Sequence, residues 1–419
     1  MYKLLTLIIS LITIFYNYKK KRFISSSSSW VFCYVLIFVI FPIVNSDLVF
    51  YNQNKIDKYS FLGMIMFFIG LVLGSKIVIK KNTNFKKGTL EVPNFNVSLF
   101  CFIIFLSITL GILIYKLQLS GIISILNGNL TSKRFALELD SSSSAFVFSV
   151  HLLFPCVLSV WISAKDKKKK RISFICLAAY LIINLLFVFT RIFIITLLAI
   201  ILIYEIRCKS NFKQFFYLVI GASLLILFMI SLNYIRTFGF KSHVGFSNIF
   251  DFNYIFESTD FSASYYWFDE LLNYDAPYIR LTVYLKPIFA FIPRSIWSNK
   301  PEPLSLQILK QIDPLLAASG YSTAGNSVLG EGYAIAGNFG MILFPFIWGT
   351  LCGKLDKNYF NRLKYNNNRV VLRDIYFYIF EVFVIMSAQR GDWSQYMTIV
   401  IWFYMLPLYI MSKISTKFH

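Results

Sequence analysis

The feature that most constrains this 419-residue chain is a series of eleven apolar runs separated by charged or polar breaks. A helix needs about 20 apolar residues to cross the hydrocarbon core of a bilayer, so runs of this kind predict membrane-spanning helices. The runs lie near residues 3–18, 30–48, 60–79, 96–117, 145–164, 172–189, 191–206, 214–234, 338–353, 370–388 and 393–411. We therefore expect an all-α polytopic membrane protein.

The composition excludes the other classes that a strongly basic chain suggests. Hydrophobic residues make up 57% of the sequence, and the formal net charge is +21. The chain is too apolar to supply the polar surface of a soluble nucleic-acid-binding protein, and the same apolar content excludes a disordered basic tail. We expect no nucleic acid among the partners. The charge instead indicates topology, because Lys and Arg concentrate in cytoplasmic loops.

The alternation of breaks on the two sides of the membrane predicts the orientation. With the N-terminus outside, the lysine-rich breaks 19–22 and 165–171 fall inside, and so does the C-terminus. All of the excess positive charge then lies inside, as the positive-inside rule requires. This alternation holds only if residues 172–204 form two short helices joined at Thr190 and Arg191.

The predicted spans divide the chain into three parts. Residues 1–234 contain eight spans, residues 235–337 form one long outer segment, and residues 338–419 contain three spans. Long loops in compact proteins are usually functional or disordered. This segment is rich in aromatic residues and has apolar stretches such as 284–292, so we expect it to fold against the outer face with interfacial helices. A structural cap without chemistry is the alternative.

Cofactor and disulfide motifs are absent from the sequence. It contains no metal-ligand cluster, Walker loop or dinucleotide fingerprint, so we expect neither a metal nor a cofactor. The six cysteines fall in predicted spans or at their inner ends, which argues against a disulfide framework in the outer segments. The serine tracts at 25–29 and 141–144 are typical of low-complexity linkers.

Arginines on the predicted outer side are candidates for binding an anion. The six are Arg134, Arg191, Arg236, Arg280, Arg294 and Arg390. Three of them, Arg191, Arg236 and Arg390, lie where a span meets the outer surface. The guanidinium group offers a planar fork of donors that suits phosphate, and it stays charged when partly desolvated. Together they predict a site for a lipid phosphate or pyrophosphate, although each one alone also fits a snorkelling anchor.

The segment FIPRSIWSNKP, residues 291–301, is the first motif of the outer segment. It places the cations of Arg294 and Lys300 on a stretch stiffened by two prolines, with Trp297 between them. An indole face packs well against a sugar ring. The motif therefore suits an anionic ligand that is partly sugar.

The segment GNSVLGEGYAIAGNFG, residues 325–340, is the second motif and places Glu331 among glycines. Glycines allow a substrate to approach closely, and inverting glycosyl transfer needs a base to take a proton from the acceptor hydroxyl. The alternative is that the glycines let helices pack closely at the membrane boundary and that Glu331 is an exposed acid in the first turn of a helix.

Other side chains compete with Glu331 for the role of base. They are Asp392, Asp269, Glu270, Glu381, His151 and His243. Asp392 is expected to orient Arg390 in an ion pair, and Asp269 and Glu270 are interpreted as facing solvent. Glu381 lies in the middle of a predicted span, where an acid is costly unless it is paired, so it suggests a role of its own at a different depth.

Taken together, these features resemble bacterial O-antigen polymerases of the Wzy type, which belong to a wider group of oligosaccharide repeat-unit polymerases and ligases. The resemblance rests on the large outer segment, Arg191 in FTRIFII, the PRSIWSNKP and GEGYAIAGNFG segments, and Arg390 before the last span. It covers most of residues 170–405. The chain departs from many lipid-phosphosugar glycosyltransferases in lacking an acidic pair in the first outer loop, which favours a polymerase over an enzyme that adds single sugars.

The resemblance implies a GT-C-like helical bundle in the bacterial cytoplasmic membrane that joins polyprenyl-pyrophosphate-linked oligosaccharides at the outer face without a metal. Arg294 and Glu331 would be catalytic, with Glu331 activating the acceptor hydroxyl. The implied pyrophosphate ligands are Arg191, Arg236, Arg294 and Arg390, assisted by Lys300. The implied sugar contacts are Trp297, Tyr321 and Tyr333. The corresponding partners are the lipid-linked oligosaccharides, membrane lipids, a chain-length regulator and a flippase.

Two other functions fit part of the pattern. A ligase that moves finished polymer onto a lipid core or protein uses the same donor and would show similar arginines. A flippase or transporter of lipid-linked sugars would usually place charged groups in mid-membrane and show repeated halves. Here the informative charges gather at the predicted outer ends, and no internal repeat is visible. The polymerase is therefore the favoured reading.

Overall fold

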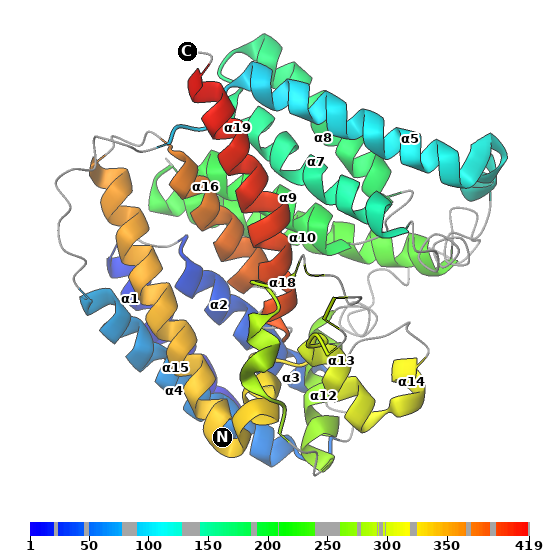
Figure 1. The fold of residues 1–419 in the computed structure, drawn as a ribbon. Helices are drawn as coiled ribbons and strands as arrows, with labels where there is room; N and C mark the ends of the chain where they lie inside the picture. The colour runs from blue at the N-terminus through cyan, green and yellow to red at the C-terminus, as the bar shows by residue number, and fades with distance from the viewer. Residues whose placement is uncertain are drawn as a thin grey trace.

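The computed structural model describes residues 1–20, 24–45, 50–77, 90–127, 143–185, 191–207, 209–238, 260–274, 278–290, 292, 296–297, 299–318, 325–365, 370–385 and 391–417. The secondary-structure elements in these ranges are all helices, and the ranges contain no β-strand. The predicted all-α class is therefore confirmed. Figure 1 shows the helices packed around a shared interior.

The first part of the chain contains the helices α1 to α10 of the described structure. In order they are α1 (Tyr2–Lys19), α2 (Ser26–Val35), η1 (Leu36–Ile40), α3 (Phe41–Val44), α4 (Gln53–Lys76), α5 (Phe95–Asn127), α7 (Ser143–Ser163), α8 (Lys167–Ile183), α9 (Arg191–Ile206) and α10 (Asn211–Phe238). The π-helix η1 joins α2 to α3, so that these three elements make one continuous helix. The stretch 172–204 is divided between α8 and α9, as its length predicts.

The second part mixes short and long helices. In order they are α12 (Asp260–Asn273), η4 (Leu281–Leu285), α13 (Leu304–Ile312), α14 (Pro314–Ala318), α15 (Val328–Tyr365), α16 (Leu372–Ile379), η5 (Phe380–Ile385), α18 (Trp393–Ile399), η6 (Val400–Met405) and α19 (Leu406–Lys417). The element η4 is a 3₁₀-helix, and η5 and η6 are π-helices. The π-helix η5 continues α16, and η6 joins α18 to α19.

Each of the eleven apolar runs overlaps a helix, but fewer helices have the length and composition of a membrane span. Within the described residues five qualify: Ser26–Val44, Gln53–Lys76, Phe95–Tyr115, Val328–Leu363 and Tyr396–Lys417. Two shorter apolar helices cover Phe148–Ser163 and Phe193–Ile206. The described residues thus belong to an all-helical membrane protein in which five of the eleven predicted spans are supported, and the other spans and the GT-C-like bundle are not confirmed.

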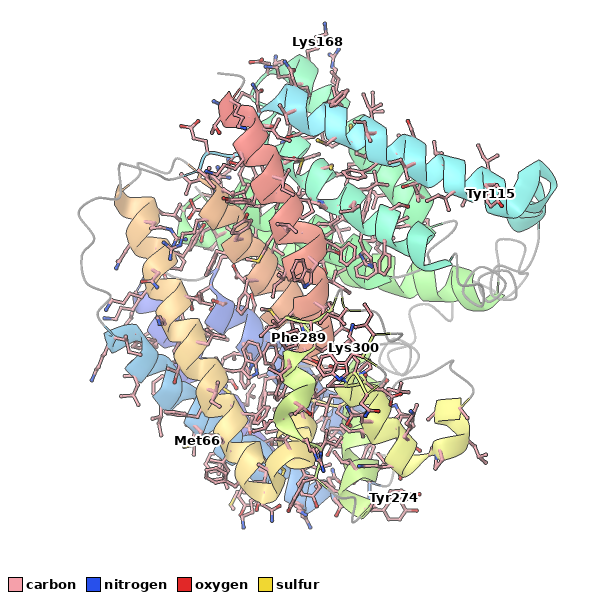
Figure 2. All side chains as sticks on the ribbon, in the orientation of Figure 1. Met66, Tyr115, Lys168, Tyr274, Phe289 and Lys300 are labelled. Carbon is pink, nitrogen blue, oxygen red and sulfur yellow. The ribbon has the colours of Figure 1, made fainter. Side chains whose placement is uncertain are left out.

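The two ends of the molecule carry different parts of the chain. The N-terminus and the helices α12, α13 and α14 lie at one end in Figure 1, and the C-terminus lies at the other. Figure 2 shows Tyr274 at the first end and Lys168 at the second. The predicted alternation requires this grouping, because it places the N-terminus and residues 235–337 on one side and the C-terminus and residues 165–171 on the other. We call these the α12 end and the C-terminal end.

Helices α4 and α15 form the most extensive helix pair of the described structure. Glycines line the crossing: a Cβ added at Gly70 or Gly74 of α4, or at Gly349 or Gly353 of α15, would collide with the backbone of the opposite helix. Small residues let two helix backbones approach closely, which is the usual way of packing helices inside a membrane. This pair forms a rigid frame that extends to the α12 end.

The serine tract at 25–29 is not a linker. Ser25 caps α2 by accepting a hydrogen bond from the backbone N–H of Ser28, and Ser26 and Ser27 are fully buried. Both donate through their backbone N–H and hydroxyl groups to the carboxylate of Asp356 on α15. The linker prediction failed because the acceptor lies 330 residues away in the sequence. The second tract, 141–144, lies partly outside the described residues.

Asp269 on α12 does not face solvent, contrary to the sequence-based interpretation. Its side chain is buried, and its carboxylate accepts hydrogen bonds from the backbone N–H groups of Tyr51 at 3.0 Å and Asn52 at 2.8 Å. These N–H groups lie at the start of α4, where a helix has no internal acceptors for them. Asp269 therefore fastens the described part of the 235–337 segment to the bundle.

Replacing Asp269 with Ala should lower the free energy of unfolding by about 1–3 kcal/mol, because two N–H groups at the start of α4 lose a charged acceptor. Thermal unfolding of the purified protein in detergent measures the effect. The control is Glu270→Ala, one residue later in the same helix, where the side chain is half-buried. Equal stability of the two variants would contradict the capping role of Asp269.

Candidate functional site

The element α15 begins with a short arm that folds back on the rest of the helix. Ala336 and Gly337 have non-helical backbone angles, and Gly337 has a φ of 60°. A Cβ at Gly332 would collide with the carbonyl of Gly340, and a Cβ at Gly340 with that of Gly332. Eight residues of straight helix would place these glycines about 12 Å apart, so the chain must reverse between them. The arm, residues 328–335, lies before the predicted span boundary at 338.

Glu331 lies on this arm and is fully buried. Its Oε1 accepts a hydrogen bond of 2.7 Å from the hydroxyl of Tyr284, whereas no described residue provides a hydrogen-bond partner for Oε2. The alternative of an exposed first-turn acid is therefore wrong, although the glycines around Glu331 do pack closely. A buried carboxylate oxygen without a donor is costly and marks a site that a ligand hydroxyl can complete.

The start of α18 forms the opposite wall of the site. Gly391 and Asp392 both have left-handed backbone angles, with φ of 86° and 58°. A Cβ at Gly391 would collide with the carbonyl oxygen of Asn326, so the turn before α18 is pressed against the turn before the arm. The backbone N–H groups of Asp392 and Trp393 face the carboxylate of Glu331. The positive end of the α18 dipole thus points at this carboxylate.

Asp392 ties this turn to the start of α13. Its carboxylate accepts hydrogen bonds from the backbone N–H of Ser305 at 3.2 Å and its hydroxyl at 2.8 Å, and from the hydroxyl of Ser394 at 2.7 Å. The side chain is buried. The described partners of Asp392 are therefore serines, and the predicted ion pair with Arg390 stays untested because Arg390 lies outside the described residues.

Aromatic rings surround the Glu331–Tyr284 pair. Tyr284 stacks on Trp393 with ring centroids 5.0 Å apart, and Trp348 meets Trp393 edge to face at 6.2 Å. Burial, and next the charge of Glu331, raise the pKa of Tyr284 above its ordinary value. The phenol therefore stays protonated and remains a donor to the carboxylate throughout the physiological range.

The side chain of Lys300, a predicted pyrophosphate ligand, forms hydrogen bonds within its own loop. Its Nζ donates to the backbone oxygens of Ala290 at 2.6 Å and Ile292 at 2.9 Å. Trp297 packs edge to face against Phe289, with centroids 5.7 Å apart. Both side chains are half-buried. The two residues thus stabilise the turn that leads from η4 to α13, and Figure 2 shows Lys300 and Phe289 close together in the view, near the middle of the molecule.

The remaining predicted residues are placed only in part. The backbones of Arg191 and Arg236 belong to α9 and α10, but their side chains are not described. Arg294, Arg390 and Tyr321 lie outside the described residues. The predicted convergence of arginines is therefore neither shown nor contradicted.

Tyr333 lies on the arm two residues after Glu331 and is half-buried. The ammonium group of Lys55, near the start of α4, lies 5.2 Å from the centre of its ring. Sequence reasoning missed both Lys55 and Tyr284. A pattern along the chain could not identify Tyr284, because its contact with Glu331 spans 47 residues.

The site as described consists of one buried acid, one phenol donor and the first turn of α18. Within the described ranges no group of three or more His, Cys, Asp or Glu side chains is arranged to hold a metal ion. Comparison with known proteins gives no match to a family model, to a curated protein or to a solved structure.

Proposed function

We propose that this protein is a glycosyltransferase that joins polyprenyl-pyrophosphate-linked oligosaccharide repeat units into a polymer at the outer face of the bacterial cytoplasmic membrane. The observation that carries the proposal is the buried carboxylate of Glu331, whose Oε2 has no hydrogen-bond partner among the described residues. The resemblance to Wzy-type polymerases supplies the substrate class, and the carboxylate supplies the base that this reaction needs.

In the proposed step, an acceptor hydroxyl donates its hydrogen bond to Oε2 of Glu331. The hydroxyl oxygen attacks the anomeric carbon of the growing chain and forms the new glycosidic bond. The bond between that carbon and the pyrophosphate oxygen breaks, and its electron pair leaves with the pyrophosphate. Because the hydroxyl attacks from the face opposite the pyrophosphate, the configuration at the anomeric carbon is inverted, and the hydroxyl proton passes to Glu331. Arg191, Arg236, Arg294 and Arg390, with Lys300, would balance the charge that builds up on the leaving group.

The surroundings of Glu331 suit this role. Tyr284 donates to Oε1, the backbone N–H groups of Asp392 and Trp393 face the carboxylate, and Oε2 has no hydrogen-bond partner among the described residues. A rigid, dry site strengthens electrostatic interactions in the transition state. The arm is also held by the hydrogen bond from the backbone N–H of Ile279 to the carbonyl of Ala334.

The test uses the purified protein in lipid nanodiscs and the single lipid-linked repeat unit that a deletion strain accumulates. Products longer than one repeat should appear, and they should persist in the presence of EDTA. A deletion strain should accumulate single lipid-linked repeats. Long polymer left on the polyprenyl carrier would instead identify a ligase. Movement of the repeat unit across liposomes without elongation would identify a flippase, and either result would overturn the polymerase.

Replacing Tyr284 with Phe should lower kcat of repeat-unit joining by about 10- to 100-fold with little change in KM, because a hydrogen bond to a charged group is worth about 1.5–3 kcal/mol. Initial rates in nanodiscs measure both constants. Tyr274→Phe is the matched control, since Tyr274 is exposed at the α12 end. A rise in KM alone would show that Tyr284 binds the substrate and does not hold Glu331.

A further inference from the structure

A second pair of buried acids lies away from Glu331, in the half of the bundle nearer the C-terminal end. Asp356 belongs to the last part of α15, and Glu381 belongs to the π-helix η5. Both side chains are almost fully buried, at 1% and 0% exposure. The proposed glycosyl transfer uses neither of them. An acid inside a membrane protein is expensive to bury, so a pair of them calls for a function.

Both carboxylate oxygens of Asp356 accept hydrogen bonds. Its Oδ1 accepts from the backbone N–H of Ser26 at 2.9 Å and from the Ser26 hydroxyl. Its Oδ2 accepts from the backbone N–H of Ser27 at 3.2 Å and from the Ser27 hydroxyl at 2.6 Å. Four donors at the N-terminus of α2 stabilise a negative charge on this carboxylate. Asp356 is therefore the ionised member of the pair.

The carboxylate of Glu381 accepts fewer hydrogen bonds than that of Asp356. Its Oε1 accepts a hydrogen bond of 3.1 Å from the hydroxyl of Ser29, and Oε2 is buried with no hydrogen-bond partner among the described residues. Asp356 lies close enough for the two charges to repel each other. Neither acid forms a salt bridge with a described residue.

The titratable groups around Glu381 come from two helices. Cys352 and Tyr359 of α15 and Tyr378 of α16 all lie within its electrostatic reach, together with Asp356. The positive charge of Arg207 acts on Tyr378. Cys352 and the two tyrosines are uncharged, and the two tyrosine hydroxyls are hydrogen-bonded to each other at 2.5 Å. The described groups facing Glu381 thus add no positive charge of their own.

Two ionised carboxylates inside the bundle would repel each other in a medium that solvates charge poorly. We propose that Asp356 and Glu381 together bind one monovalent cation, H⁺ or Na⁺, in the interior of the bundle. The cation sits on Oε2 of Glu381, with the hydroxyl of Ser29 beside it and the charge of Asp356 attracting it. The π-helix η5 fits this assignment, because π-helical turns inside α-helices occur frequently at functional sites.

The two cations are distinguished by two measurements on the purified, full-length protein in detergent at neutral pH. Infrared difference spectroscopy between wild type and Glu381→Gln reports the C=O stretch of a protonated carboxylic acid. Thermal unfolding in NaCl and in choline chloride reports Na⁺ binding, because a ligand that binds only the folded state raises the melting temperature. Glu302→Gln is the control, since Glu302 pairs with Lys310 and is partly exposed.

A protonated-acid band that disappears in Glu381→Gln supports H⁺ as the bound cation. A melting temperature raised by Na⁺ in wild type and in Glu302→Gln, but not in Glu381→Gln, supports Na⁺. The absence of both effects overturns the proposal. If Glu381→Gln does not fold, Ser29→Ala replaces it, and the proposal then requires a shifted acid band or a weakened response to Na⁺. The proposed cation site does not depend on the proposed polymerase activity. The variants therefore test the cation site whether or not they still join repeat units.

Discussion

Replacing Glu331 with Gln should lower the rate of repeat-unit joining by about 10²- to 10⁴-fold, which is the usual contribution of a general base. The amide keeps the shape of the side chain and can still accept a hydrogen bond from Tyr284, but it cannot take the proton of the acceptor hydroxyl. Expression in the membrane should stay close to wild type. Elongation of the lipid-linked repeat in nanodiscs measures the rate, and polymer length in a complemented deletion strain provides an independent measurement.

Glu270→Gln is the matched control, because it makes the same chemical change on α12 without touching the arm. Arg294→Ala belongs in the same experiment and should also leave single lipid-linked repeats. The polymerase proposal would be contradicted if both Glu331→Gln and Arg294→Ala made normal long-chain polymer at unchanged membrane expression. If Glu331→Gln retains activity and Arg294→Ala does not, the base must be a residue other than Glu331. The proposed pyrophosphate site of arginines would then still stand.

Replacing Gly340 with Ala should destabilise the protein by about 2–3 kcal/mol and abolish repeat-unit joining. The new Cβ would collide with the carbonyl oxygen of Gly332, so the arm that carries Glu331 would have to move away from the long part of α15. Thermal unfolding in detergent measures the stability, and the elongation assay measures the activity.

Gly111→Ala is a sharp control for this substitution. Gly111 lies in α5 with no atom within 4 Å of an added Cβ, so alanine should be neutral or stabilise the helix by up to about 1 kcal/mol. If the Gly340 and Gly111 variants unfold at the same temperature, the close crossing of the arm is not a feature of the protein in solution.

The positions of the helices were largely predictable from the sequence. Each apolar run overlaps a helix because a buried or lipid-facing backbone must satisfy its own hydrogen bonds. The number of spans was less predictable. The run at 172–189, for example, is only partly described: α8 ends at Ile183 after 17 residues, and residues 186–190 lie outside the described ranges. Whether this run crosses the membrane therefore stays untested.

A residue of the candidate site could be predicted only where its own type and its sequence neighbours make it unusual. Glu331 stands out in the sequence because it is an acid among glycines. Its partner Tyr284 looks like one aromatic residue among many, and the contact depends on how η4 packs against α15. The predicted ion pair of Asp392 with Arg390 stays untested, whereas its contact with Ser305, 87 residues earlier, could not be read from the sequence. Such partners follow from tertiary packing and leave no mark on local sequence.

The turn before α18 also sets the order in which the site can be assembled during synthesis. Chains emerge from the ribosome from the N-terminus onward. The arm of α15 is therefore inserted before Gly391, Asp392 and Trp393 exist, and until then Glu331 lacks the wall that faces it. The nascent protein thus carries its proposed base for some 60 residues of elongation without the wall formed by the turn before α18. Under the proposed function, Glu331 can act as the base only after the late helices have joined the bundle.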